Sequence, residues 1–158
     1  MTWSEADLRV RRLFRPTAEE LEALARFDHE AFGPTGLRPC DLGLLALTGA
    51  LFVACLDEEV VGSCQLLRML EDPEALWMVG LYVRPEWRGR GMGKGLLGEI
   101  IGAMPLFCAR SLVLTVDMAN VAALALYRSA GFQLLCEVPE IYGRGESRHL
   151  MRLDLPKP

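Results

Sequence analysis

The chain has 158 residues, of which 51% are hydrophobic and 24% charged, and its formal net charge is −4 at pH 7. This length and composition predict a single globular domain over residues 1–158, large enough to bury a core of its own. The acidic balance argues against nucleic acid as a partner, because no basic surface dominates.

The cysteines and the apolar segments argue against disulfide-rich, zinc-binding and membrane-spanning proteins. The five cysteines are Cys40, Cys55, Cys64, Cys108 and Cys136. They are scattered, with no Cys-x-x-Cys pair, so we expect reduced core residues, neither a disulfide framework nor a zinc site, and no metal cofactor. The longest uncharged run, residues 42–56, is too short to span a bilayer. Since the N-terminus also lacks signal-peptide blocks, we expect a cytoplasmic protein without a membrane partner.

The first predicted elements are a strand and a helix. Residues 8–13 alternate between apolar and polar side chains, which indicates a strand with one wet face. Thr17 followed by Glu20 has the spacing of a capping box and predicts a helix start. Helical spacing of apolar residues then continues until Gly33-Pro34 ends it.

A second helix and a hairpin are expected next. The shorter helix covers residues 41–47, with Asp41 as its cap and Gly49 at its end. Residues 51–56 and 60–70 predict the two strands of a hairpin, joined by an acidic turn.

The C-terminal half alternates strands and helices. The predicted strands are residues 76–83, 112–116, 132–138 and 149–155, and the predicted helices are residues 96–104 and 121–129. Gly98 and Gly102 stand four apart within the first of these helices, which we interpret as close packing on a neighbouring strand. The chain shows no internal repeat or linker, so the pattern favours one domain of mixed α and β elements.

A glycine-rich stretch separates the strand ending at Val83 from the helix that follows. Its sequence is Arg88-Gly89-Arg90-Gly91-Met92-Gly93-Lys94-Gly95. Glycines at the start of a helix leave backbone N–H groups open to a ligand, and the helix dipole adds positive potential. The stretch therefore predicts a bound phosphate or pyrophosphate.

Two common phosphate motifs fit this stretch poorly. A P-loop needs four residues between its glycines, whereas Gly89 and Gly93 are separated by three, and Gly95 replaces the magnesium-binding hydroxyl. A dinucleotide fingerprint occurs formally at Gly93, Gly95 and Gly98, but nine residues separate Val83 from its first glycine. A nucleotide-binding protein is kept as one alternative.

Two motifs resemble a known family. The segment Val83 to Gly93 resembles the acetyl-CoA signature Arg/Gln-x-x-Gly-x-Gly/Ala of the GNAT superfamily of N-acetyltransferases. The segment Asn120 to Phe132 is similar to that family's Asn-x-x-Ala-x-x-Leu-Tyr-x-x-x-Gly-Phe block. Both occur in the expected order, with the expected elements between them.

The resemblance implies an α/β fold and an activity. The fold would be a mixed, mostly antiparallel sheet of six to seven strands flanked by about four helices, with splayed central strands. The activity would be transfer of an acetyl group from acetyl-CoA to a primary amine by direct attack in a ternary complex. The amine would belong to a small molecule or a peptide. Dimers are common among similar proteins, so a homodimer is one assembly that the resemblance allows.

The resemblance also implies which residues hold acetyl-CoA. Backbone groups near Leu81, Tyr82 and Val83 would pair with the pantetheine and polarise the thioester carbonyl. The loop residues that would hold the pyrophosphate are Arg88, Gly89, Arg90, Gly91, Met92, Gly93 and Lys94. The two arginines are either phosphate partners or solvated loop charges.

Tyr127 corresponds to the tyrosine that is usually assigned as the acid protonating the CoA sulfur. A phenol with its ordinary pKa near 10 stays protonated at neutral pH and can donate to a thiolate. The alternative is a tyrosine packed against the sheet. Asn120 is expected to cap the helix, to hydrogen-bond the cofactor, or both.

The general base is left open. Trp77, Met78 and Val79 occupy the strand where some family members carry a glutamate. Thr115 stands where relatives that acetylate a ribosomal N-terminal alanine have one, which weakens the narrower hypothesis of an N-terminal acetyltransferase. The remaining candidates are Asp117, Glu71, Glu140, Tyr142 and His149, or a chain of water molecules to bulk solvent.

A polar, glycine-rich hairpin over residues 142–148 precedes the last strand. Similar hairpins in the GNAT superfamily border the acceptor site, so the resemblance implies Tyr142 and Glu146 as candidate substrate contacts, and an exposed turn without a role is the alternative. Because the strand glutamate is missing, a non-catalytic acyl-CoA-binding or sensing domain is the other alternative function.

Overall fold

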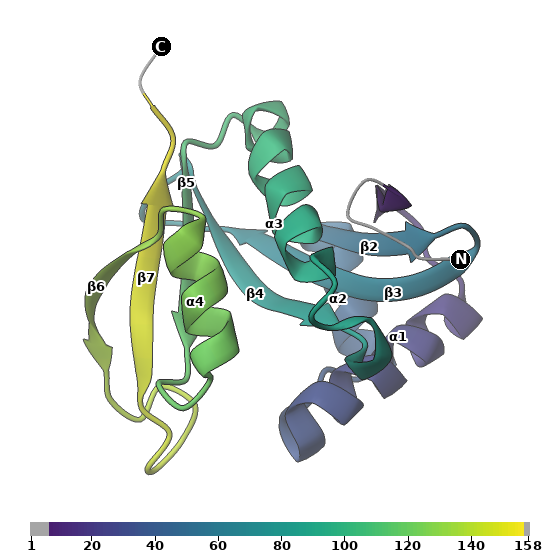
Figure 1. Cartoon of the computed structure of the whole chain (residues 1–158), viewed down its shortest axis with the longest axis horizontal. Coiled ribbons are helices and arrows are strands. Elements are labelled where there is room, and N and C mark those ends of the chain that lie inside the picture. Colours follow the sequence, from purple (N-terminus) through teal and green to yellow (C-terminus); the bar gives the residue numbers. More distant parts are fainter. Residues whose placement is uncertain (1–6, 157–158) are drawn as a thin grey trace. The chain divides into compact units, whose positions relative to one another are not determined.

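The computed structural model describes residues 7–156 (Figure 1). These residues fall into two compact units: unit 1 contains residues 7–67 and 79–100, and unit 2 contains residues 68–78 and 101–156. Seven strands are hydrogen-bonded in the order β1-β2-β3-β4-β5-β7-β6. The pairs β1–β2, β2–β3, β5–β7 and β6–β7 are antiparallel and β4–β5 is parallel, which confirms the predicted mixed, mostly antiparallel sheet. Within residues 7–156, no helix is long and apolar enough to cross a membrane.

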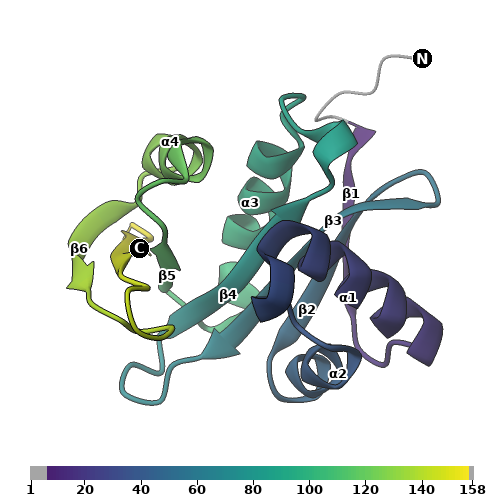
Figure 2. The same cartoon turned by 90° about the horizontal axis from the view of Figure 1, so that it is seen from below.

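Unit 1 places three helices on a strand meander. Its elements are β1 (Arg9–Leu13), α1 (Ala18–Phe32), η2 (Gly33–Thr35), α2 (Pro39–Thr48), β2 (Ala50–Leu56), most of β3 (Glu59–Arg68), the second half of β4 (Ala75–Val83), η3 (Pro85–Trp87) and most of α3 (Met92–Ala103). Helices α1 and α2 lie on one face of the strands and α3 on the other (Figures 1 and 2). The core between α1, α2 and the first two strands is built from Leu13, Leu24, Ala25, Leu42, Ala46, Leu51, Val53 and Cys55.

The start of α1 confirms the predicted capping box. Glu20 N–H donates to Thr17 Oγ1 at 3.2 Å, and Thr17 N–H donates to Glu20 Oε2 at 2.8 Å. Both bonds satisfy amides that the first helical turn leaves without partners.

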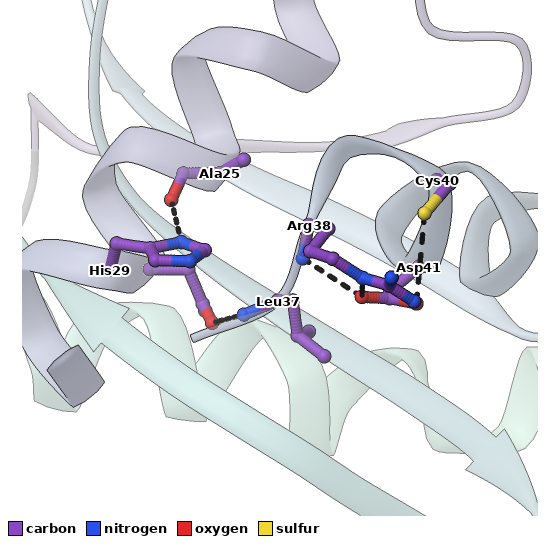
Figure 3. Close-up of polar contacts among 7 residues, drawn as sticks. Ala25, His29, Leu37, Arg38, Cys40 and Asp41 are labelled. Atoms are coloured by element: carbon purple, nitrogen blue, oxygen red, sulfur yellow. Dashed lines mark hydrogen bonds and ion pairs between the residues drawn. The ribbon is translucent and has the colours of Figure 1, made fainter. Parts of the chain in front are cut away.

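The predicted cap of α2 is wrong by three residues. Arg38 is the N-cap, and Asp41 lies in the first turn, where its carboxylate accepts from the Arg38 N–H at 2.9 Å and pairs with the guanidinium (Figure 3). Pro39 explains the earlier start, because proline suits the first helical position, where no N–H is needed.

The connection between α1 and α2 is held by a buried carboxylate. Asp28 is 4% exposed, and its Oδ2 accepts from the Leu37 N–H at 2.5 Å. A Cβ at Gly36 would lie 2.7 Å from His29 Cα, so only glycine lets the chain pass so close to α1. The ring of His29 is fixed by a 2.9 Å bond between Nδ1 and the Ala25 carbonyl (Figure 3).

Unit 2 contains a three-stranded antiparallel group with one helix. Its elements are the first half of β4, η4 (Met104–Phe107), β5 (Ser111–Val116), α4 (Val121–Ser129), β6 (Gln133–Val138) and β7 (Arg148–Asp154). Strand β7 lies between β5 and β6 (Figure 1). The parallel ladder of β4 with β5 runs from Ala75↔Ser111 to Trp77↔Val113. The expected splay between these strands beyond Trp77 stays a prediction.

The helix after the glycine-rich stretch starts earlier than predicted. It begins at Met92, not at residue 96, and the 3₁₀ helix η4 follows it from Met104. The prediction took the helical pattern from Leu96 and placed the preceding glycines at the mouth of the helix. In the structure Gly93 and Gly95 lie in its first turn.

The expectation about the paired glycines of α3 is wrong. A Cβ at Gly98 or Gly102 would meet nothing within 4 Å, so these glycines do not mark close packing of α3 on a strand.

The prediction that all five cysteines are core residues is correct for two of them: Cys55 and Cys64 are buried. The exposed cysteines, which are not core residues, are Cys40, Cys108 and Cys136.

Candidate functional site

The glycine-rich stretch forms a tight turn that leads directly into α3. Gly89 and Gly91 have φ angles of 72° and 82°, in the left-handed region where glycine is favoured. The Gly95 N–H donates to the Gly91 carbonyl at 2.9 Å, which is an i to i−4 bond of the new helix. The amides of Met92 and Gly93 precede this first bond at the start of the helix and are suited to an anion.

Arg88 and Arg90 both rest on aromatic rings of the same segment. Arg88 Nε donates to the Val83 carbonyl at 2.8 Å, and its guanidinium lies 5.7 Å from the centre of the Tyr82 ring. The Arg90 guanidinium lies 5.2 Å from the Trp87 ring. Both arginines are exposed, so their positive charge is accessible to a phosphorylated ligand.

The loop also contains an unpaired buried donor. The indole Nε1 of Trp87 is buried and has no hydrogen-bond partner in the structure. A buried donor left unsatisfied costs about 1–3 kcal/mol. The accessible donors of the loop are the helix amides and the two arginines, which suit a phosphate or pyrophosphate group.

The end of β4, where the pantetheine is expected, is ordered by its neighbours. The Arg84 N–H donates to the Val61 carbonyl at 2.8 Å, which joins this end of β4 to β3. The Tyr82 hydroxyl donates to Glu30 Oε2 at 3.4 Å, and its ring stacks on Phe27 at 6.2 Å. Burial, followed by the charge of Glu30, raises the pKa of this phenol. The Tyr82 side chain therefore packs on and hydrogen-bonds to α1, and the part of Tyr82 that can contact a cofactor is its backbone.

In unit 2, Asn120 and Tyr127 lie on α4. Asn120 is the N-cap, and its Oδ1 accepts from the Ala123 N–H at 3.1 Å, which confirms the capping role. Tyr127 is 8% exposed, and its ring packs on Phe132 with centres 5.5 Å apart. The packing role of Tyr127 is thus present, and its role as an acid stays a prediction.

The hairpin between β6 and β7 is tied to the end of β5. The Tyr142 hydroxyl lies 2.7 Å from Thr115 Oγ1, and the Arg148 guanidinium lies 5.4 Å from the Tyr142 ring. Glu146 pairs with the same arginine at 2.9 Å. The structure therefore brings Tyr142 next to Thr115, and both candidate substrate contacts next to Arg148.

The candidate bases mostly have structural partners. Asp117 accepts from the Ala119 N–H at 2.9 Å and lies 3.9 Å from Arg148. Glu140 accepts from the Gly145 N–H at 3.0 Å. His149 is a half-buried residue of β7, and Glu71 is exposed in the turn after β3. None of these contacts identifies one of the candidates as the general base.

Sequence reasoning gave no role to one buried polar pair in β3. Gln65 and Ser63 are 1% and 3% exposed, and Gln65 Nε2 donates to Ser63 Oγ at 3.3 Å. Gln65 Oε1 is buried without a partner. The sequence did carry a signal for this pair: Ser63 and Gln65 stand two positions apart, so their side chains share one face of a strand whose interior is otherwise apolar.

The family model of the acetyltransferase (GNAT) family matches residues 9–132. The chain belongs to this family. The match extends from β1 to the end of the second sequence motif and so includes the loop, β4, α3 and α4.

Relatives within the family act on different amines. The chain is 30% identical over 92 residues to aminoglycoside N(6')-acetyltransferase type 1 of Stenotrophomonas maltophilia, covering 54% of this chain and 60% of that protein. It is 30% identical over 78 residues to L-amino acid N-acyltransferase MnaT of Escherichia coli, covering 48% and 45%. The chain spans between 26% and 60% of the length of the curated relatives that it matches.

The fold agrees with solved structures of the family. The structure of yncA from Salmonella typhimurium with its cofactor acetyl-CoA superposes with a TM-score of 0.77. The match covers 96% of this chain and 95% of that one, at 17% identity. At this identity the likeness shows the GNAT fold.

Proposed function

We propose that the protein transfers an acetyl group from acetyl-CoA to the primary amine of a small molecule. The observation that carries the proposal is the loop before α3, where Gly89 and Gly91 are left-handed and the chain enters the helix at Met92, so that the positive end of the helix dipole lies at this turn. Family membership supports a thioester of CoA as the ligand of this loop.

Acetyl-CoA would supply an activated acyl group, and this chain's residues would orient it and move protons. In the transfer, the amine nitrogen forms a bond to the carbonyl carbon and the carbon–sulfur bond breaks. Backbone groups near Leu81 and Val83 would orient the pantetheine. Tyr127 would give its phenolic proton to the departing thiolate, because a neutral phenol is a competent donor at neutral pH. The extra proton on the amide nitrogen would leave to water, and water would return a proton to the phenolate.

Small amines are favoured over protein N-termini as acceptors. Curated relatives are named for aminoglycosides and L-amino acids. Thr115, hydrogen-bonded to Tyr142, also occupies the position of the glutamate in relatives that acetylate a ribosomal N-terminal alanine. A small cationic or zwitterionic amine is therefore the proposed substrate class.

The test is release of free thiol from acetyl-CoA in the presence of three acceptors: L-methionine sulfone, kanamycin, and a peptide with an N-terminal alanine. We expect release that depends on one of the two small amines and a product heavier by one acetyl group. Binding of acetyl-CoA without release for any acceptor would instead establish a non-catalytic acyl-CoA-binding domain.

A further inference from the structure

A polar group lies buried on the α1 side of unit 1, beside the strand expected to hold the pantetheine. Gln65 Oε1 lies 3.0 Å from the point that a Cβ of Gly80 would occupy, and Phe32 Cε2 lies 4.0 Å from the same point. Gln65 of β3, Gly80 of β4 and Phe32 at the end of α1 therefore converge. Phe32 is 45% exposed and Gln65 is 1% exposed.

The amide of Gln65 is only half satisfied. Its Nε2 donates to Ser63 Oγ at 3.3 Å, whereas Oε1 is buried without a partner. Leaving a buried acceptor unpaired costs about 1–3 kcal/mol, and an apolar residue of similar size would avoid this cost. An oxygen in this state is complementary to a ligand that presents an N–H or O–H group.

The place of this oxygen relates it to the reaction. Gly80 directly precedes Leu81, the first backbone position proposed to hold the pantetheine near the thioester. Because position 80 lacks a side chain, Gln65 Oε1 lies against the strand itself. A group bound to this oxygen would therefore lie next to the strand that orients the acyl group.

We propose that Gln65 Oε1 binds the acetyl acceptor by taking a hydrogen bond from the N–H of the attacking amine. The inference rests on the proposed function and names an acceptor-binding residue for it. The bond fixes the direction of the nitrogen lone pair, which is the orientation that transfer requires. A neutral amide also favours the charged ammonium less than a carboxylate would, so the amine keeps the lone pair with which it attacks.

The decisive variant is Gln65→Leu, assayed with the best acceptor of the three-amine panel. We expect kcat/KM for the amine to fall about 10-fold or more, because a site built to hydrogen-bond the substrate loses its polar partner. We expect the KM for acetyl-CoA to be unchanged. The midpoint of thermal unfolding should stay equal or rise, because the unsatisfied acceptor is gone.

Three further variants separate binding from packing. Gln65→Glu keeps an oxygen at the same place and should retain more activity than the leucine variant. Gly80→Ala places a Cβ 3.0 Å from Oε1 and should lower kcat/KM by displacing the flexible amide, with little change in stability. Cys64→Ala is the matched control: this buried residue of β3 points to the opposite face, so its loss should lower stability and leave kcat/KM of the folded enzyme intact.

The outcomes divide clearly. An unchanged kcat/KM in Gln65→Leu would overturn the inference, and so would a loss confined to acetyl-CoA affinity, since Gln65 would then act on the cofactor. A lower unfolding midpoint with proportional loss of activity would also overturn it and leave a packing role. A wild type that binds acetyl-CoA but acetylates none of the three amines would refute the proposed function itself.

Discussion

Tyr127 has a packing contact through its ring and a proposed chemical role through its hydroxyl group, so removing the hydroxyl oxygen tests the chemical role alone. Its ring packs on Phe132, which Tyr127→Phe would preserve, while the hydroxyl proposed to protonate the thiolate would be lost. We expect kcat to fall by about 10²-fold or more, as for removal of a general acid, with the Kd for acetyl-CoA changed less than about 2-fold. Steady-state thiol release and calorimetric titration measure the two quantities.

The opposite pattern would contradict the acid role. If Tyr127→Phe weakened acetyl-CoA binding and kept kcat, the hydroxyl would be a binding group. A change in the unfolding midpoint serves as the control for packing, and we expect it to be small because the ring and its contact with Phe132 remain.

Gly93 is the loop residue at which a side chain should matter most for the cofactor. It is half-buried in the first turn of α3, where backbone amides are proposed to approach the pyrophosphate. Gly93→Val should block that approach and weaken acetyl-CoA binding by about 10-fold or more, the loss of at least one charge-assisted hydrogen bond. Calorimetry gives the Kd directly.

Gly98→Ala is the matched control on the same helix. A Cβ at Gly98 meets nothing within 4 Å, so alanine there should leave the Kd unchanged and stabilise α3 by about 0.5–1 kcal/mol. Undiminished binding in Gly93→Val would show that the cofactor does not use this turn.

At the scale of elements, the connection from α1 to α2 depends on a carboxyl group whose pKa is raised. Burial of Asp28 raises its pKa above the ordinary value of 3.8, and the Leu37 N–H and the neighbouring His29 oppose the shift. The folded state therefore holds the proton to higher pH than the unfolded state. The resulting stability is complete below pH 3.8 and is lost as the pH rises through the folded-state pKa.

Asp28→Asn tests this dependence. The asparagine oxygen can still accept from the Leu37 N–H, but it cannot ionise. We expect the variant to gain stability relative to the wild type as the pH rises from 3 to 7, measured by urea unfolding at each pH. A constant difference would exclude the role of Asp28 ionisation. Asp28→Ala, which removes the acceptor, should be destabilised at every pH by about 1–3 kcal/mol.

The local elements could be predicted because short-range rules determine them. Thr17 and Glu20 define the start of α1 by a bond between neighbours in sequence, and the structure contains that bond. The start of α3 could not be placed, because Gly93 and Gly95 interrupt the apolar spacing that indicates a helix, which becomes regular only from Leu96. The observed start is instead defined by the left-handed turn at Gly91, and helix packing at Met92, Leu96 and Leu97 outweighs the low helix propensity of glycine.

At the scale of the whole molecule, the sequence motifs located the family but not the contacts made across the fold. Gln65 and Gly80 are fifteen positions apart, and Thr115 and Tyr142 are separated by 27. Their meeting depends on strand register and on the path of the hairpin, which alternation of apolar residues does not specify. The motifs therefore predicted a candidate cofactor loop and the resemblance pointed to Tyr142 and Glu146, whereas the position of Gln65 beside Gly80 and the bond of Tyr142 to Thr115 needed the structure.

The cofactor assignment makes a last prediction for the intact chain. A ligand that binds the folded state alone raises stability by about 2.7 kcal/mol at 100 times its Kd. For a chain of this size that is a rise of roughly 5–10 °C in the unfolding midpoint. Acetyl-CoA and CoA should both produce it, because both carry the pyrophosphate that the loop is proposed to hold.

NAD and ATP provide the contrast in the same thermal-unfolding measurement. They carry phosphates and adenine but lack the pantetheine that the end of β4 is proposed to orient, so neither should shift the midpoint at equal concentration. A shift with NAD or ATP and none with CoA would mean that the loop belongs to a nucleotide site. Equal shifts with all four ligands would show that the phosphates bind without contribution from β4, and would remove Leu81, Tyr82 and Val83 from the proposed site.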